Sequence, residues 1–311
     1  MSLDRIHLVV LDYLELPDDA WQRLRDLTEV VTYDTVPRNE AEILDRLGDA
    51  DGVVVTSVTA LSASVLSQLP QLRCIIVPGV GMDHIDLAIA QAQGIEVINC
   101  PTYNANAVAE FTIGLMFAIA RHIPLAHQTL ATGYWQPQTL QGRELSSQHL
   151  VVIGAGTIGQ AVAQKAIALG MQVSTATSKT SPDELDTLIA AADFLSLHLP
   201  LTQATHNLLN ARRLALMKPT AYLINTARGG TIDSEALFTT LEAKQIAGAA
   251  LDVFENEPTT GQPHQTILAL AQLDNVITTP HIAYNTDAAI RRLGEELVEK
   301  LEDWLGKGVK G

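Results

Sequence analysis

The sequence predicts an α/β protein with two domains, each built on an open parallel sheet. Short runs of Val and Ile, such as those at 7–12 and 149–154, alternate with segments of helical spacing such as 18–27. Continuous apolar runs are typical of strands covered on both faces, and their alternation with helices implies right-handed crossovers. The chain has 311 residues. At roughly 150 residues per domain, that length fits two domains.

The elements follow one another in two series. In the first series we expect strands at 30–34, 51–57, 73–79 and 95–100, and helices at 39–47, 62–69 and 86–94. A long helix is expected at about 104–123, and Trp135 is expected to be a buried anchor of the Gly- and Gln-rich loop that follows. A second series runs from 149–154 to 275–283, and the tail after it has helical periodicity.

We expect this tail to return to the first series. One domain would then comprise 1–100 and 284–311, and the other, at 101–283, would be inserted into it. In terms of known architectures, the prediction is a Rossmann domain inserted into a flavodoxin-like domain.

Composition and charge exclude several classes of protein. Hydrophobic residues make up 47% of the chain, which argues against disorder. With 20 Lys and Arg against 35 Asp and Glu, the net charge of −15 repels nucleic acid and anionic lipid. Two cysteines form no disulfide framework, and no cluster has metal-ligand spacing. The apolar run at 111–120 is too short to span a bilayer, so we expect a cytoplasmic protein without metal.

A glycine motif predicts a dinucleotide site. Gly154, Gly156 and Gly159 form G-x-G-x-x-G directly after an apolar strand and directly before a helix. In that context the first glycine allows a tight turn, the second lets the backbone approach a pyrophosphate, and the third lets helix and strand pack closely. The free N–H groups of the helix N-terminus then face the anion.

The strand after this helix bears on the choice of cofactor. An acidic residue near its end would bind the ribose 2′-hydroxyl of NAD. Here Thr177 stands at that position, followed by Ser178 and Lys179. Two hydroxyls and an ammonium can accept a 2′-phosphate, which favours NADP, although a solvated turn is the alternative interpretation.

Three later strands each end in a polar residue, and ligands of open α/β sheets bind at strand ends. Arg228 can hold a carboxylate and polarise a carbonyl, and His281 can donate a proton to a developing alkoxide. Glu257 can accept a hydrogen bond from the imidazole and fix its tautomer. These three groups together are what the reduction of a 2-keto acid requires.

Several segments resemble the NAD(P)-dependent D-2-hydroxyacid dehydrogenase family, including GAGTIG, LMKPTAYLINTARGGTID, ALDVFENEP and TPHIA. The resemblance covers essentially the whole chain. It implies catalytic roles for Arg228, Glu257 and His281, a nicotinamide-carboxamide contact for Asp252, and a substrate-carboxylate loop at Val80 and Gly81. It also implies a cleft that closes on the substrate and a homodimer built through the nucleotide domain.

Further residues are expected in these sites. Tyr103, next to the long helix, is a candidate substrate contact, with packing as the alternative. The remaining residues expected to contact the dinucleotide are Thr157, Ile158, Pro200, Thr205, Thr226 and Ala227.

The preferred substrates are glyoxylate and hydroxypyruvate, followed by pyruvate. A phosphorylated substrate is disfavoured because the N-terminal loops offer mainly Arg73 as a nearby cation. A different class of protein stays open as an alternative, namely a non-catalytic binding protein of the same fold that senses dinucleotides.

Overall fold

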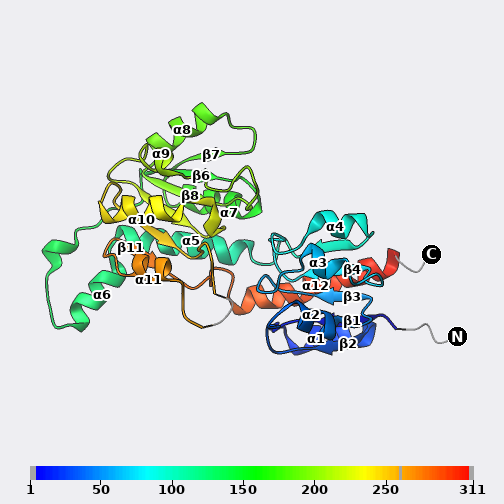
Figure 1. The fold of residues 1–311 in the computed structure, drawn as a ribbon. Coiled ribbons are helices and arrows are strands. Elements are labelled where there is room, and N and C mark those ends of the chain that lie inside the picture. Colours follow the sequence, from blue (N-terminus) through cyan, green and yellow to red (C-terminus); the bar gives the residue numbers. More distant parts are fainter. Residues whose placement is uncertain (1–4, 259–260, 308–311) are drawn as a thin grey trace. The chain divides into compact units, whose positions relative to one another are not determined.

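The computed structural model describes residues 5–258 and 261–307. It divides into two compact units, unit 1 with Met1–Asn104 and Asn285–Gly311, and unit 2 with Ala105–Tyr284 (Figure 1). The C-terminal segment of unit 1 forms one long helix, α12 (Asp287–Lys307), which packs against α1 (Asp18–Leu27) of the same unit.

Unit 1 contains a five-stranded parallel sheet of order β2-β1-β3-β4-β5. This is the flavodoxin-like order, in which the first strand lies inside the sheet. The strands are β1 (His7–Val10), β2 (Glu29–Thr32), β3 (Gly52–Val54), β4 (Cys74–Val77) and β5 (Glu96–Asn99). The short helices between them are α2 (Glu40–Leu47), α3 (Ala63–Leu66) and α4 (Leu87–Ala92).

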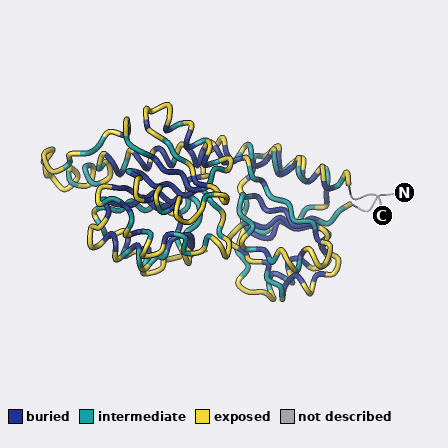
Figure 2. The backbone as a smooth tube through the Cα atoms, turned by 90° about the horizontal axis from the view of Figure 1, so that it is seen from above, coloured by how far each residue is buried: buried dark blue, intermediate teal, exposed yellow. Residues whose placement is uncertain are grey.

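Alternate side chains of these strands face opposite layers, as the strand period of two requires. On one face Val9, Val53 and Ile75 pack with apolar residues of α2, α3 and α4. Helices α1 and α12 lie on the other face (Figure 1). The inner strands β1, β3 and β4 are consequently buried on both sides, whereas the edge strand β2 is largely exposed. Buried backbone, dark blue in Figure 2, runs through the middle of each unit.

Unit 2 contains a six-stranded parallel sheet of order β11-β10-β9-β8-β6-β7. Its strands are β6 (His149–Ile153), β7 (Gln172–Ala176), β8 (Phe194–Leu197), β9 (Tyr222–Asn225), β10 (Gly248–Leu251) and β11 (Val276–Thr278). Its helices are α5 (Ala105–Ala120), α6 (Ile123–Ala131), α7 (Thr157–Ala168), α8 (Pro182–Ala191), α9 (Ala211–Leu214), α10 (Ser234–Glu242) and α11 (Gln265–Ala271). Two 3₁₀ turns lie at η1 (Pro137–Leu140) and η2 (Gly229–Thr231).

This sheet also lies between two helical layers. Residues of α5 and α7 pack on the face that carries Leu150 and Val152, and residues of α8, α9, α10 and α11 pack on the face that carries Val151 and Ile153. The predicted fold class of two parallel-sheet α/β domains is therefore confirmed.

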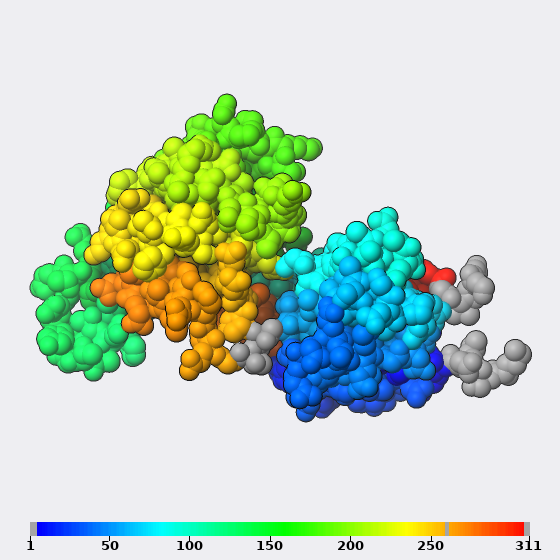
Figure 3. All heavy atoms as spheres, viewed as in Figure 1, coloured from blue at the N-terminus to red at the C-terminus, as the bar shows by residue number. Residues whose placement is uncertain are grey.

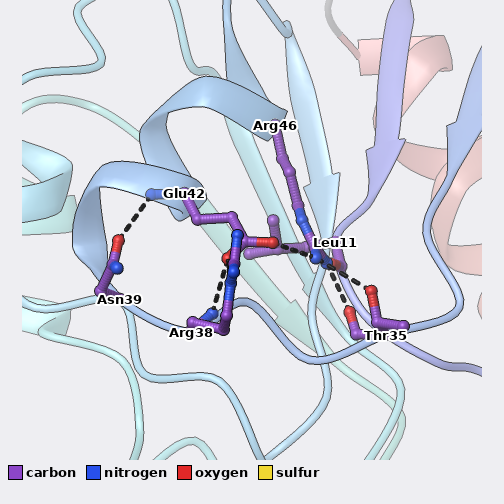
Figure 4. A network of polar contacts seen from close by, with 6 residues as sticks. All are labelled: Leu11, Thr35, Arg38, Asn39, Glu42 and Arg46. Carbon is purple, nitrogen blue, oxygen red and sulfur yellow. Dashed lines mark hydrogen bonds and ion pairs between the residues drawn. The ribbon is translucent and has the colours of Figure 1, made fainter.

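A buried arginine fastens α2 to the sheet of unit 1 (Figure 4). The guanidinium of Arg46 donates to the carbonyl oxygen of Leu11 at 3.0 Å, to the carbonyl and hydroxyl oxygens of Thr35, and to Glu42 at 2.6 Å. Glu42 also accepts the Nε–H of Arg38 at 2.8 Å. These contacts lower the pKa of Glu42 to about 2, chiefly through the hydrogen bond from the Arg38 side chain.

The long helix expected at about 104–123 is α5, which ends at Ala120, and α6 begins at Ile123 after a break at Arg121 and His122. His122 has a left-handed φ of 52° in this break. One prediction for the segment that follows was wrong. Trp135 is not a buried anchor, because its side chain is 82% exposed. No residue of α6 is buried either.

Among the described residues, no single helix has the length and apolar character needed to cross a membrane. Helices α5 and α6 pass that test only as a pair, and they are bent by 56° at the break between them.

Candidate active site

The expected dinucleotide residues of unit 2 gather at the carboxyl edge of its sheet. They follow β6, β7, β8, β9 and β10, strands that are all parallel. Strand β6 lies between β7 on one side and β8 on the other, so the strand order reverses direction at β6. Such a switch in strand order is where open α/β sheets bind ligands.

The glycine loop after β6 fits a pyrophosphate. Gly154 has a φ of +101°, and a Cβ there would lie 2.1 Å from the carbonyl oxygen of His198. A Cβ on Gly159 would lie 1.9 Å from the carbonyl oxygen of Gly154, so the helix could not pack so closely on the turn. A Cβ on Gly156 would meet nothing within 4 Å. Open space at the N-terminus of α7 is what an anion bound by helix N–H groups needs.

Most other expected dinucleotide residues are exposed or are used in local contacts. Thr177, Ser178 and Lys179 are exposed after β7, and the Thr177 hydroxyl accepts the N–H of Lys179 at 3.2 Å. The Thr205 hydroxyl donates to the carbonyl oxygen of Pro200 at 2.6 Å and closes the loop after β8. Thr157 is exposed, while Ile158 and Ala227 are partly buried. The hydroxyl of buried Thr226 lies 2.9 Å from the Thr112 hydroxyl on α5.

Arg228 follows β9 in a turn that its neighbours fix. The side chain of Asn225 accepts the N–H of Ala227 and donates to the carbonyl oxygen of Arg228, both at 3.0 Å. The Thr231 hydroxyl donates to the same carbonyl at 2.6 Å. Asn225 was not singled out in the sequence, although an Asn that ends an apolar strand before a turn is a usable signal.

Glu257 and His281 are in direct contact. Nδ1 of His281 lies 2.7 Å from one carboxylate oxygen of Glu257, and the other oxygen accepts the backbone N–H of Phe254 at 2.8 Å. A carboxylate at Nδ1 places the proton there, which leaves Nε2 as the nitrogen that can exchange a proton with a substrate. About a third of each side chain is exposed, 37% for His281 and 33% for Glu257, so the pair is accessible.

Asp252 organises the loop that carries His281. Its fully buried carboxylate accepts the Thr279 hydroxyl at 2.6 Å and the N–H groups of Ile282 and Ala283 at 2.9 Å. The carbonyl oxygen of Asp252 accepts the N–H of His281, whose φ of 53° is unusual for a residue with a side chain. The expected contact between Asp252 and a nicotinamide carboxamide stays a prediction, since this carboxylate has no accessible surface here.

The turn of Arg228 and the loop of Glu257 touch one another. A Cβ on Gly229 would lie 1.9 Å from the carbonyl carbon of Phe254, so only glycine permits this approach. Strands β9, β10 and β11 end level, with Leu251 paired to both Asn225 and Thr278. A guanidinium, a carboxylate and an imidazole are thus brought to adjoining loops at one sheet edge. Together they can bind an anion and supply a proton.

Another histidine of unit 2, His198, takes no part in that arrangement. His198 is buried at the end of β8, where its Nε2 lies 2.8 Å from the Ser196 hydroxyl, and burial lowers its pKa to about 4. It is therefore neutral near pH 7 and unsuited to supply a proton. Within 5–258 and 261–307, no group of three or more His, Cys, Asp or Glu side chains is placed to hold a metal ion.

The candidate substrate residues of unit 1 lie at the carboxyl end of its sheet. Val80 and Gly81 are partly buried in the loop after β4, and Tyr103 is buried, with its carbonyl oxygen bound by Nε of Arg292 at 2.7 Å. The prediction that Arg73 lies near this loop was wrong. Arg73 precedes β4, so it lies at the opposite edge of the sheet, and it pairs there with Asp51 at 3.0 Å.

The chain is similar to known proteins over most of its length. Residues 113–283 match the model of the D-isomer specific 2-hydroxyacid dehydrogenase family, NAD-binding domain. The chain is 40% identical over 300 residues to a hydroxypyruvate reductase of Thermotoga maritima, covering 94% of this chain and 96% of the relative. It spans only 49% and 57% of two D-3-phosphoglycerate dehydrogenases, from Synechocystis and Methanocaldococcus jannaschii.

Solved structures are similar over nearly the whole chain. An acyclic imino acid reductase in complex with NADPH and D-Arg superposes with a TM-score of 0.88 at 30% identity, covering 97% of this chain and 98% of that one. An NADPH-dependent glyoxylate/hydroxypyruvate reductase from Sinorhizobium meliloti superposes with a TM-score of 0.83 at 29% identity, covering 98% and 95%.

The chain therefore belongs to the D-isomer specific 2-hydroxyacid dehydrogenase family, whose members are NAD(P)-dependent oxidoreductases.

Proposed function

We propose that this protein reduces a small 2-keto acid to a D-2-hydroxy acid with a nicotinamide dinucleotide. The observation that carries the proposal is the contact between Glu257 and His281 at 2.7 Å, beside the turn of Arg228. The enzyme names of the relatives quoted above support it, and nothing observed favours a non-catalytic sensor of dinucleotides.

Each of the three side chains has one role in this proposal. Arg228 binds the substrate carboxylate and polarises the keto group, because a guanidinium is a planar donor of fixed charge. His281 releases the proton on Nε2 to the alkoxide oxygen as it forms. Glu257 accepts the Nδ1–H of His281 and so fixes the tautomer and the orientation of the imidazole.

The dinucleotide would be held by the glycine loop and the N-terminus of α7. The open space at Gly156 and the close approaches at Gly154 and Gly159 fit a pyrophosphate. When bound, the dinucleotide supplies the hydride. In this proposal the insertion at 101–283 is the dinucleotide domain, and 1–100 with 284–311 is the substrate domain.

We further infer a preference for NADP. Thr177, Ser178 and Lys179 are exposed where a carboxylate would select NAD, and a lysine ammonium favours a 2′-phosphate. Similar structures contain NADPH or NADP in two cases and NAD in a third, so the preference rests on the residues after β7.

The substrate is proposed to be small and without a phosphate. Among the described residues, the loops after β1, β3, β4 and β5 of unit 1 carry no Lys or Arg before the long helix. With Arg73 at the other edge of the sheet, no cation of these loops is available to a phosphate. Glyoxylate and hydroxypyruvate are therefore preferred, and pyruvate comes next.

Steady-state kinetics test the proposal directly. Purified protein is mixed with NADH or NADPH and with glyoxylate, hydroxypyruvate, pyruvate or phosphohydroxypyruvate, and the absorbance at 340 nm is followed. Turnover of an unphosphorylated keto acid, faster with NADPH, is expected. Tight dinucleotide binding without turnover of any keto acid would instead favour the sensor.

A homodimer built through unit 2 is also proposed. The segment of α6 and the following loop exposes Ile123, Leu130, Tyr134 and Trp135, and it stands out from the body of unit 2 (green in Figure 3). Exposed apolar side chains gathered on one segment are typical of an interface, and a second copy would bury them symmetrically. Sedimentation equilibrium, with Trp135→Glu as the disruptive variant, decides the oligomeric state.

A further inference from the structure

The loop of Val80 and Gly81 is fastened to the end of β5 by two hydrogen bonds. The side-chain N–H of Asn99 donates to the carbonyl oxygen of Val80 at 2.7 Å. The backbone N–H of Cys100 donates to the carbonyl oxygen of Gly79 at 3.0 Å. Two consecutive carbonyl groups of the loop therefore point toward two consecutive residues at the end of one strand.

This arrangement determines where the next two N–H groups point. A trans peptide is planar, and its N–H lies opposite its C=O. Because the Gly79 carbonyl faces Cys100, the N–H of Val80 points away from β5. The N–H of Gly81 points away from β5 for the same reason, since the Val80 carbonyl faces Asn99. Within the described chain, neither N–H donates a hydrogen bond to the protein.

We infer that Asn99 is a positioning residue for the substrate carboxylate: its carboxamide fixes the peptide plane that presents the Gly81 N–H. This inference rests on the proposed function, to which it adds that the loop binds the substrate carboxylate together with Arg228. Successive backbone N–H groups on one side of a loop form an anion-binding concavity. Asn99 is partly buried and touches no substrate in this account, so it acts only through the loop.

The sharpest variant is Asn99→Asp, which keeps the size of the side chain and removes the N–H donor. The carboxylate would face the Val80 carbonyl oxygen, so this peptide plane would lose its anchor. We expect the KM of the keto acid to rise about tenfold or more, because a lost hydrogen bond and a misdirected N–H both weaken binding. Maximal kcat should fall less, and the Kd of the dinucleotide should change less than about twofold.

Gln71→Glu is the matched control. The Gln71 carboxamide also donates to a backbone carbonyl, that of Gly48, at the same distance of 2.7 Å in the same unit. It precedes β4 and so lies near the opposite edge of the sheet. This variant should leave KM unchanged. An equal rise of KM in both variants would overturn the inference, because the effect would then be a general weakening of unit 1.

Binding of oxamate, a planar isostere of pyruvate, gives a second measurement that needs no turnover. Calorimetry on the enzyme preloaded with dinucleotide should show a Kd for oxamate about tenfold higher in Asn99→Asp than in the unchanged protein. An unchanged Kd would overturn the inference even if the protein is a reductase. Binding that depends on Asn99, without turnover of any keto acid, would refute the proposed function and leave the inference standing. If Asn99→Asp does not fold, Asn99→Ala replaces it with the same expected outcomes.

Discussion

Nδ1 of His281 lies 2.7 Å from the Glu257 carboxylate, whose second oxygen is bound to the N–H of Phe254 at 2.8 Å. The imidazole is therefore oriented by a carboxylate that is itself fixed in its loop. His281→Ala should lower kcat by about 10²- to 10⁴-fold, the contribution typical of a positioned general acid. Glu257→Gln should lower kcat by less, because the amide oxygen can still accept the Nδ1–H.

Fluorescence titration with the dinucleotide serves as the control for both variants. Its Kd should stay near the value of the unchanged protein, since neither side chain lies at the glycine loop. An unchanged kcat in His281→Ala would mean that another group supplies the proton.

Arg228 should be required for substrate binding and for the chemical step. Arg228→Ala should reduce kcat/KM by about 10²- to 10³-fold, because a donor aimed at developing charge is worth about 3–4 kcal/mol. Arg228→Lys should recover little, since an ammonium lacks the bidentate geometry of a guanidinium. The Arg228 guanidinium donates to the carbonyl oxygen of Ala227 at 2.8 Å. Arg143→Ala is the control, because Arg143 likewise donates to a backbone carbonyl of unit 2, that of Thr220. Rates like those of the unchanged protein in Arg228→Ala would remove this residue from the mechanism.

The sequence predicted the sheets and the strand-end residues well, because both depend on local patterns. Continuous Val and Ile runs predicted the strands. Gly154 and Gly156 lie in the turn after β6, and Gly159 lies in the first turn of α7, as their spacing predicts. Contacts between distant segments have no such local signal. The bracing of Arg228 by Asn225 and the binding of the His281 loop by Asp252 therefore emerged only from the structure.

The wrong predictions concern burial and position, which depend on the surroundings of a residue and not on its type. Trp135 was expected to be a buried anchor of the Gly- and Gln-rich loop, yet its side chain is 82% exposed. Arg73 is near the carboxylate loop in sequence, but β4 separates the two by the length of a strand.

Gly229 should tolerate no side chain. In Gly229→Ala the new Cβ would lie 1.9 Å from the Phe254 carbonyl carbon, so the loop that carries Glu257 must move. We expect a lower Tm and a loss of kcat. Gly114→Ala, on α5 of the same unit, meets nothing within 4 Å and should stabilise by about 0.5–1 kcal/mol, since alanine is the better helix former. Thermal unfolding followed by circular dichroism measures both, and equal Tm values would contradict the close approach.

Lys179 should set the choice between the two dinucleotides. Lys179→Ala removes the ammonium proposed to pair with the 2′-phosphate, so kcat/KM for NADPH should fall about tenfold while that for NADH stays constant. Thr177→Asp should go further and favour NADH, because a carboxylate accepts from the ribose 2′-hydroxyl and repels a phosphate. Loss of activity with both dinucleotides in Lys179→Ala would indicate a structural role for this turn.

Glu42 should make the stability of unit 1 depend on acid pH. Hydrogen bonds from Arg38 and Arg46 lower the pKa of this carboxyl from 4.5 to about 2 in the folded protein. A group with a depressed folded pKa stabilises the fold above its unfolded pKa, and the stabilisation is lost as the pH falls toward the folded value. The Tm of the unchanged protein should therefore drop between about pH 4.5 and pH 2.

The variant Glu42→Gln tests this prediction. Its Tm should be lower than that of the unchanged protein at pH 6 and should fall less on acidification. Asp186, whose pKa is also lowered to about 2, titrates in both proteins, so the difference between their pH profiles isolates Glu42. Parallel profiles would show that the carboxylate adds nothing to the contacts that Arg46 makes with Leu11 and Thr35.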